Sequence, residues 1–149
     1  MAEVKHARGT KLLLKVASVA APTVFTTFCS INAERGITFT AGANDQEIPD
    51  CDNPDKIAWV VREKTNLSVS ITGSGVLDTS DVQKFYDWLI SENTLPVKVI
   101  VDVPAASGGV TFTGPFHLTE FSITGNRGEK MQASIGLSSS GAVTSGANT

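Results

Sequence analysis

The sequence contains few of the residues from which metal and redox sites are built. It has two histidines and two cysteines among 149 residues. His6 and His117 are too few for a multi-histidine metal site. Cys29 and Cys51 could pair, but one possible bridge in a chain of this size favours reduced, partly buried thiols. The scarcity of these residues therefore indicates neither a metal centre nor a disulfide-stabilised fold.

Long apolar runs and an excess of basic charge are also missing. The apolar stretch Leu12–Ala21 is far too short to span a membrane. Lys15 interrupts it and Glu3 precedes it, so it does not fit a secretory signal either. We expect this stretch to form the first strand of a protein made in the cytoplasm. The net charge of −3 provides no basis for tight nucleic-acid binding, although DNA could still be enclosed without being gripped.

No arrangement of residues predicts catalysis. His117 is expected on the polar face of a strand, and no motif places a nucleophile or an acid beside it. Gly73-Ser-Gly75 lacks the third glycine and the βαβ context of a nucleotide-binding loop. The acidic segment Asp45–Asp55 lacks the central glycine and terminal glutamate of an EF-hand, which favours a solvated loop. The sequence therefore predicts no enzyme, no cofactor, no metal and no small-molecule substrate.

Alternating apolar and polar residues predict a mainly β protein. A chain of 149 residues can form one domain with a substantial core, and 41% hydrophobic with 18% charged residues fits a folded protein. The apolar phase changes near Thr119-Glu120, which predicts a β-bulge. The expected strands are Leu12–Val16, Phe25–Ile31, Gly36–Ala41, Ile57–Arg62, Asn66–Gly73, Val97–Val103, Val110–Gly125 and a last strand that turns Met131, Ala133, Ile135 and Leu137 inward.

One amphipathic helix is predicted at about Ser80–Glu92. Ser80 fits an N-cap, with Gln83 three residues later to complete a capping box. Trp88 falls outside the apolar stripe and is a candidate for a subunit interface, whereas Trp59 is expected in the core. The stripe consists of Val82, Phe85, Tyr86, Leu89 and Ile90.

Three segments lie outside the predicted elements. Residues 1–10 are polar and read as an N-terminal arm. Residues 138–149 are rich in glycine and serine and read as a flexible C-terminal tail. Ala41–Lys56 is irregular and acidic and reads as a long loop. Long loops in compact domains usually have a function or are mobile, so this segment is a candidate contact site.

Four motifs occur in the order and spacing of a known family. On these motifs the chain resembles the major tail tube proteins of long-tailed phages and of gene transfer agents, over about residues 10–145. The motifs are Glu47-Ile-Pro-Asp-Cys-Asp52, Ser70-Ile-Thr-Gly-Ser-Gly-Val76, Asp102-Val-Pro-Ala-Ala106, and Gly114-Pro-Phe-His-Leu-Thr119 continuing to Phe121-Ser-Ile-Thr-Gly-Asn-Arg-Gly128.

The resemblance implies a β-sandwich or partial barrel with one flanking helix, assembled as hexameric rings. Strands from all subunits would form one continuous inner barrel, which removes exposed sheet edges. Stacked rings would make a hollow tube that carries DNA from head to recipient cell in a virion or phage-like particle. The implied partners are further copies of the chain, a tape measure protein, a tail terminator and distal tail proteins.

The resemblance also suggests two functional surfaces. The loop Ala41–Lys56 would contact the next ring. The lumen should be polar and neutral to acidic, since basic side chains would bind phosphates. The candidate contact residues are Asn44, Asp45, Glu47, Asp50 and Asp52. The candidate lumen residues are Ser68, Ser70, Gln132 and Ser134, which alternate with expected core residues.

Two other functions remain open at this stage. A tube subunit of a contractile secretion-type machine would share the fold and the ring but not the DNA cargo. A monomeric ligand-binding β-barrel would show a ligand-sized cavity and would not polymerise. Neighbouring head, tape-measure and portal genes would separate the first alternative, and electron microscopy of the purified protein would separate the second.

Overall fold

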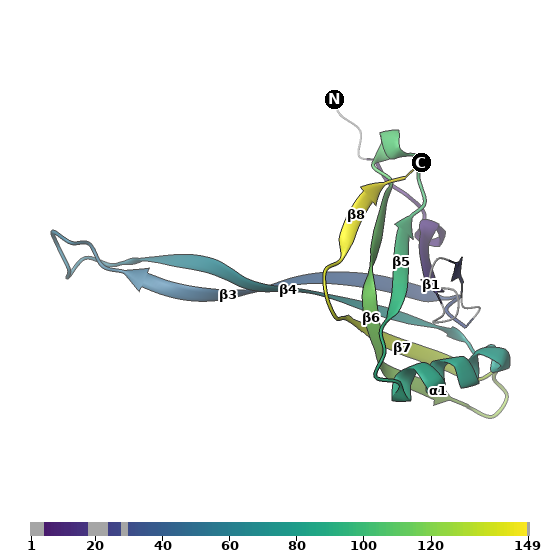
Figure 1. Ribbon diagram of the computed structural model, residues 1–149. Coiled ribbons are helices and arrows are strands. Elements are labelled where there is room, and N and C mark those ends of the chain that lie inside the picture. The colour runs from purple at the N-terminus through teal and green to yellow at the C-terminus, as the bar shows by residue number, and fades with distance from the viewer. Residues whose placement is uncertain (1–4, 18–23, 28–29, 149) are drawn as a thin grey trace.

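The computed structural model describes residues 5–17, 24–27 and 30–148, and its main feature is one antiparallel sheet of eight strands (Figure 1). The strand order is β2-β1-β5-β6-β7-β4-β3, with β8 also paired to β6. This confirms the prediction of a mainly β protein. The strands are β1 (Leu12–Ala17), β2 (Phe25–Thr26), β3 (Glu34–Ile48), β4 (Trp59–Val76), β5 (Leu95–Val101), β6 (Val110–Thr124), β7 (Gln132–Ser139) and β8 (Thr144–Ala147).

The long strand β6 joins the two halves of the sheet. Its first half pairs with β5 and β8, and its second half pairs with β7. The register shifts between Leu118 and Glu120, which confirms the predicted bulge. A bulge bends a strand and increases its twist. Core side chains from both halves consequently belong to one cluster: Leu14, Val16, Val69, Ile71, Val97, Val99, Phe116, Leu118, Ile135 and Leu137.

The alternation along each strand accounts for the core. Val97 and Val99 are buried, whereas Lys98 between them points to the other face of the sheet. The prediction for Met131 is wrong, because this side chain is 46% exposed. It precedes β7, and its carbonyl accepts a hydrogen bond from the backbone N–H of Leu77 at 2.9 Å. The inward alternation therefore begins only at Ala133.

A β-hairpin arm replaces the predicted long loop. β3 and β4 pair from Glu34↔Ser74 to Ile48↔Trp59, and the far part of the hairpin projects away from the body (Figure 1). Only residues 49–58 lie outside the two strands at the tip. The segment 41–48, predicted as loop, is strand. The expected strands Ile57–Arg62 and Asn66–Gly73 fall in one continuous strand, β4, except for residues 57 and 58. Both faces of the arm meet water, so its strands need no apolar alternation.

The arm leaves the body at Gly42. The pairing of β3 with β4 shifts register between Gly42 and Ala43. The N–H of Gly42 donates to Oδ1 of Asn66 at 3.1 Å, and the Thr65 hydroxyl donates to the Gly42 carbonyl at 3.3 Å. A Cβ at Gly42 would lie 2.5 Å from Oδ1 of Asn66, so any other residue there would displace the Asn66 side chain and break its hydrogen bond.

The C-terminal segment is more ordered than predicted. β7 continues to Ser139, and β8 pairs with β6, so residues 138–149 are not simply a flexible tail. Nδ2 of Asn148 donates to the carbonyls of Val101 and Val103 at 2.7 and 2.9 Å. Its Oδ1 accepts from the Thr111 hydroxyl at 2.7 Å. These bonds fasten the chain beyond β8 to the edge of β5 and β6.

Near the N-terminus one strand is shorter than expected. β2 comprises only Phe25 and Thr26, so the predicted strand Phe25–Ile31 is too long. The described part of β1, Leu12–Ala17, contains the whole of the predicted strand Leu12–Val16. Cys29, which was expected within the strand Phe25–Ile31, lies outside the described residues. Residues 5–8 carry no regular structure, and a single 3-10 turn at Gly9–Lys11 leads into β1. Two further 3-10 turns occupy Thr79–Asp81 and Ala105–Ser107.

The helix α1 (Val82–Ile90) is shorter than predicted, and its start is built differently. The 3-10 turn precedes it, and Oδ1 of Asp78 accepts from the Ser80 N–H and hydroxyl at 3.0 and 2.7 Å. The capping residue is therefore Asp78, which caps the 3-10 turn by accepting hydrogen bonds from Ser80; Ser80 is not the N-cap. Gln83 donates to Asp87 at 2.8 Å instead of completing a capping box.

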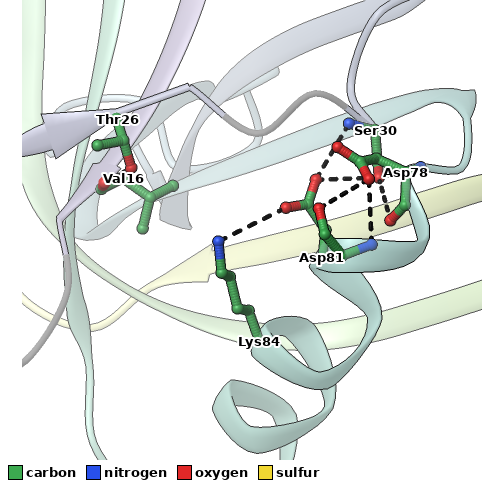
Figure 2. A network of polar contacts seen from close by, with 7 residues as sticks. Val16, Thr26, Ser30, Asp78, Asp81 and Lys84 are labelled. Atoms are coloured by element: carbon green, nitrogen blue, oxygen red, sulfur yellow. Dashed lines mark hydrogen bonds and ion pairs between the residues drawn. The ribbon is translucent and has the colours of Figure 1, made fainter.

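A buried polar network ties the start of the helix to the chain before β3 (Figure 2). Asp81 is 4% exposed, and its Oδ2 accepts from the Ser30 hydroxyl at 3.1 Å and from the Ser30 N–H at 3.3 Å. The Ser30 hydroxyl oxygen also accepts from the Asp78 N–H at 2.8 Å. Lys84 lies 3.9 Å from Oδ1 of Asp81. The buried carboxylate is thus satisfied mainly by Ser30.

Asp81→Ala should lower the free energy of unfolding by about 1.5–3 kcal/mol, because it removes a charged acceptor from two buried donors. Chemical denaturation of the subunit measures this loss. Asp87→Ala, on the exposed side of the helix, is the matched control and should change stability by no more than about 0.5 kcal/mol. Equal effects of the two variants would contradict the role assigned to Asp81.

Phe85→Ala should cost about 3–5 kcal/mol of folding stability. Phe85 is completely buried, and its ring centroid lies 5.0 Å from that of Phe121 on β6. Ile90→Ala is the control, since Ile90 is 63% exposed on the same helix. A small thermal shift for Phe85→Ala, similar to that of the control, would show that the helix does not brace the sheet.

Candidate assembly surfaces

One face of the sheet is a continuous surface of hydroxyl groups. Register places Ser70 opposite Thr38 on β3 and Ser138 on β7, and it places Ser134 opposite Ser74 and Ser122. We call this surface the hydroxyl face. It comprises Thr38, Thr40, Ser68, Ser70, Thr72, Ser74, Ser122, Thr124, Gln132, Ser134 and Ser138. All four predicted lumen residues lie on it: Ser68, Ser70, Gln132 and Ser134.

The hydroxyl face lies opposite the helix and the core. Ser134 alternates with Ala133 and Ile135, which are buried, and Ile135 pairs with Phe121, the partner of Phe85 on α1. The Ser122 and Ser134 hydroxyls bond to each other across β6 and β7. The four residues therefore share one face of the sheet, because alternation decides the face of each residue, and their place in a lumen stays a prediction.

The strand segments of this face contribute no lysine or arginine side chain to it, and His117 is the one histidine that register places there, opposite Ser138. Arg35 is the only lysine or arginine in the strand segments 34–40, 68–76, 117–124 and 132–138. It pairs with Gly73 on the core side, and its Nη1 donates to the Leu12 carbonyl at 2.6 Å. Glu34 and Glu120 occupy register positions opposite Ser74 and Gly136 on the hydroxyl face. The surface is consequently neutral to acidic.

The sheet that carries this face ends in two unpaired edges. Within the described strands, β3 pairs only with β4, and β6 beyond Phe116 pairs only with β7. Unpaired edge N–H and carbonyl groups are templates for another strand. The two edges bound the hydroxyl face on either side.

The arm carries the predicted contact residues, but not on one loop. Asn44, Asp45 and Glu47 lie on β3, where Asp45 pairs with Arg62 at 2.9 Å. Asp50 and Asp52 lie in the tip, where Oδ1 of Asp50 accepts from the Asp52 N–H at 2.9 Å. The structure brings these residues onto one projecting element and leaves all of them exposed.

Both tryptophan predictions are wrong. Trp88 is 5% exposed and belongs to the core cluster, so it is not available as an interface residue. The helix turns Phe85 and Trp88 toward the sheet and leaves Tyr86 and Ile90 of the predicted stripe more than half exposed. Trp59, expected in the core, is 87% exposed at the base of the arm tip.

The exposed apolar residues of the arm were missed by sequence reasoning. Ile57 is 91% exposed and Ile48, opposite Trp59 in register, is 57% exposed. Exposed large apolar side chains next to one another mark interaction sites. The sequence did contain one indication of this exposed site, namely a tryptophan beside a proline- and aspartate-rich segment. Trp59 was instead expected in the core.

The described residues offer little for chemistry. Among them, no group of three histidine, cysteine or acidic side chains could hold a metal ion. No helix in the described part of the chain is long and apolar enough to cross a membrane. Cys51 is an exposed thiol in the arm tip. The arrangement instead combines unpaired edges, a polar face and a projecting arm, which are features of a structural protein that associates with other chains.

Comparison with known families agrees with this class. The family described as "Phage tail tube protein" matches residues 6–145. The chain therefore belongs to the phage tail tube protein family and is a structural component of a phage-type tail. No curated protein matches the sequence significantly.

Solved structures show the same fold. A "Virion of native gene transfer agent (GTA) particle" contains a chain with 22% identity and a TM-score of 0.72, and the match covers 95% of this chain and 100% of that one. A "Tail of empty GTA particle" with C6 symmetry gives 23% identity and a TM-score of 0.69, covering 93% and 98%. The SPP1 tail tube gives 11% identity and a TM-score of 0.59, covering 95% and 79%.

Proposed function

We propose that this chain forms hexameric rings that stack into a hollow tube, and that the hydroxyl face lines the channel through which DNA passes. The observation that carries the proposal is the absence of lysine and arginine from that face. Basic groups would bind phosphates and release counterions, which would hold DNA in place. Hydroxyl groups and a few carboxylates let DNA slide. The C6 symmetry of the similar gene transfer agent tail supports six subunits.

The two free edges provide the means of closing the ring. We propose that the outer edge of β3 pairs with the second half of β6 in the next subunit. Such a contact is heterologous, because two different surfaces meet, and it closes when six rotations complete a circle. The closed barrel would leave no exposed edge along the channel. A structural role of this kind requires no catalysis.

Hydrogen exchange tests this ring closure. Assembly should slow exchange by about tenfold or more in peptides from Glu34–Thr40 and Glu120–Thr124, because edge amides that open freely in the subunit become paired. β5 is the internal control, since β1 and β6 already flank it. Tubes in which both edge peptides exchange as in the free subunit would contradict the proposal.

The arm would connect successive rings. Its far half contributes no residue to the core cluster, so we infer that the strand pairing that continues outside the body serves a contact with another subunit. The tape measure protein, the tail terminator and distal tail proteins are the further proposed partners. Electron microscopy of purified protein tests the whole proposal, since rings or tubes are expected and persistent monomers would refute it.

A further inference from the structure

The arm tip carries the net charge of the whole chain. Four of the fifteen acidic residues and one of the twelve basic residues lie in Glu47–Lys56, so the rest of the sequence has eleven of each sign. Asp50, Asp52 and Asp55 are exposed, and none of them makes an ion pair with a described residue. With the apolar residues Ile48, Ile57 and Trp59 they form what we call the acidic tip.

A hollow of about 810 Å³ lies on the body. Its charged wall residues are Lys11, Lys98 and Asp102. Nζ of Lys11 lies 3.9 Å from Oδ2 of Asp102, so Lys98 gives the wall its net positive charge. Lys5 reaches the same place, where its Nζ donates to the carbonyl of Ala106 at 3.2 Å. Apolar wall residues include Ile100, Val103 and Pro104. We call this surface the basic hollow.

Two lysines beside the hollow face each other without a carboxylate between them. Lys15 on β1 pairs directly with Lys98 on β5, so both side chains lie on the same face of the sheet. Lys98 lies 4.3 Å from the ring centroid of Phe25, and neither lysine makes an ion pair with a described residue. Like charges directly opposite on neighbouring strands destabilise a sheet, and an incoming anion would relieve this repulsion.

From this complementarity we infer that the acidic tip of one copy binds in the basic hollow of a second copy. The arm projects away from the body that carries its own hollow (Figure 1), so the two halves of the contact meet between copies. Carboxylates would face the lysines, and Trp59 and Ile57 would cover the apolar wall. Aromatic anchors surrounded by polar groups are typical of the energetically dominant part of interfaces.

The contact is consistent with a stacked tube. The hollow lies on the face of β5 opposite the core, and the hydroxyl face lies on the faces of β4 and β7 opposite the same core. Because tip and hollow are different surfaces, the contact repeats without closing and can extend a stack. The inference rests on the proposed tube and adds the receiving site for the arm.

Charge exchange tests the pairing. Lys15→Glu with Lys98→Glu, or Asp50→Lys with Asp52→Lys, should each reduce the protein found in tubes by about tenfold or more, because each puts like charges in contact. Both pairs in one chain should restore tubes. Arg127→Glu with Lys130→Glu is the matched control on the β6–β7 turn and should polymerise normally. Melting temperatures of the free subunits confirm that each variant folds.

Cross-linking tests the contact directly. A short maleimide–succinimide reagent attached at the native Cys51 should join peptides containing Lys98, Lys15 or Lys11 of another copy, and Cys51→Ser should abolish these products. Products that lead only to other lysines would overturn the inference. This readout needs contact between copies at high protein concentration and does not need tubes.

The outcomes separate this inference from the proposed function. If the unmodified protein forms no rings or tubes, the proposed tube function is refuted. The cross-linking experiment would still test whether the acidic tip contacts the basic hollow. Normal tubes from the Lys15→Glu, Lys98→Glu variant would refute only the contact between the acidic tip and the basic hollow. Loss of binding to duplex DNA in the hollow variant, with normal tubes, would identify the hollow as a nucleic-acid site and overturn the inference.

Discussion

Excising Ala43–Thr65 and joining Gly42 to Asn66 through an Asn-Gly turn is expected to yield a folded subunit that forms no tubes. The excised residues contribute nothing to the core cluster, and Gly42 and Asn66 already face each other in register. Asn-Gly is the preferred two-residue turn of a hairpin. The free energy of unfolding should therefore change by no more than about 1 kcal/mol, since a closed loop is shortened without loss of packing.

Denaturation and electron microscopy measure the two parts of this prediction. Removing only Asn44–Asp52 would be less informative, because it would leave the matching part of β4 without its partner strand. Glu63→Gln, which keeps the arm and its strand pairing and lies outside the predicted contact residues, is the control and should give normal tubes. Normal tubes from the excised chain would remove the arm from any role in stacking.

Replacing Ser68, Ser70, Gln132 and Ser134 with arginine is expected to convert the channel into a DNA-binding surface. Each side chain is at least partly exposed on the hydroxyl face, so the change should be compatible with folding. Every phosphate contact made by an added arginine contributes about −0.9 to the slope of log affinity against log salt. Even four such contacts would make affinity strongly dependent on salt, and repetition around a ring would multiply the effect.

Tubes of this variant should bind duplex DNA at low salt, and particles that contain them should release DNA slowly or incompletely. A control variant carries four arginines at exposed positions off the hydroxyl face: Thr10, Asn93, Ser107 and Asn126. Binding measured over a salt series distinguishes the two. Unchanged delivery together with unchanged DNA affinity would show that the hydroxyl face is not the channel wall.

The sequence predicted those parts of the fold in which one face is buried. Alternation on β4 and β7 was sufficient to assign Ser70 and Ser134 to the same face, since a residue's parity decides its side. The bulge near Glu120 was visible because apolar residues occupy opposite parities before and after it. In both cases the burial of one face produces a regular alternation of apolar and polar residues in the sequence.

The features that were not predicted have no such alternation in the sequence. The arm has water on both faces, so nothing requires alternation, and its polar residues resemble a loop. The helix stripe is wide enough to allow more than one rotation toward the sheet, and packing against Phe121 selects the rotation that buries Trp88. Asp78 and Ser80 are both good capping residues, and the buried network with Ser30 decides between them.

Because the two tryptophans differ in exposure to water, their fluorescence can report on folding and on assembly. Trp88 is shielded from water, and its indole Nε1 has no hydrogen-bond partner among the residues that the structure describes, whereas Trp59 is almost fully solvated. Emission from Trp88 should be blue-shifted and resistant to soluble quenchers, and emission from Trp59 should be red-shifted and easily quenched. Unfolding would abolish the first component, and burial of the arm tip would move the second, so one spectrum can follow folding and polymerisation separately.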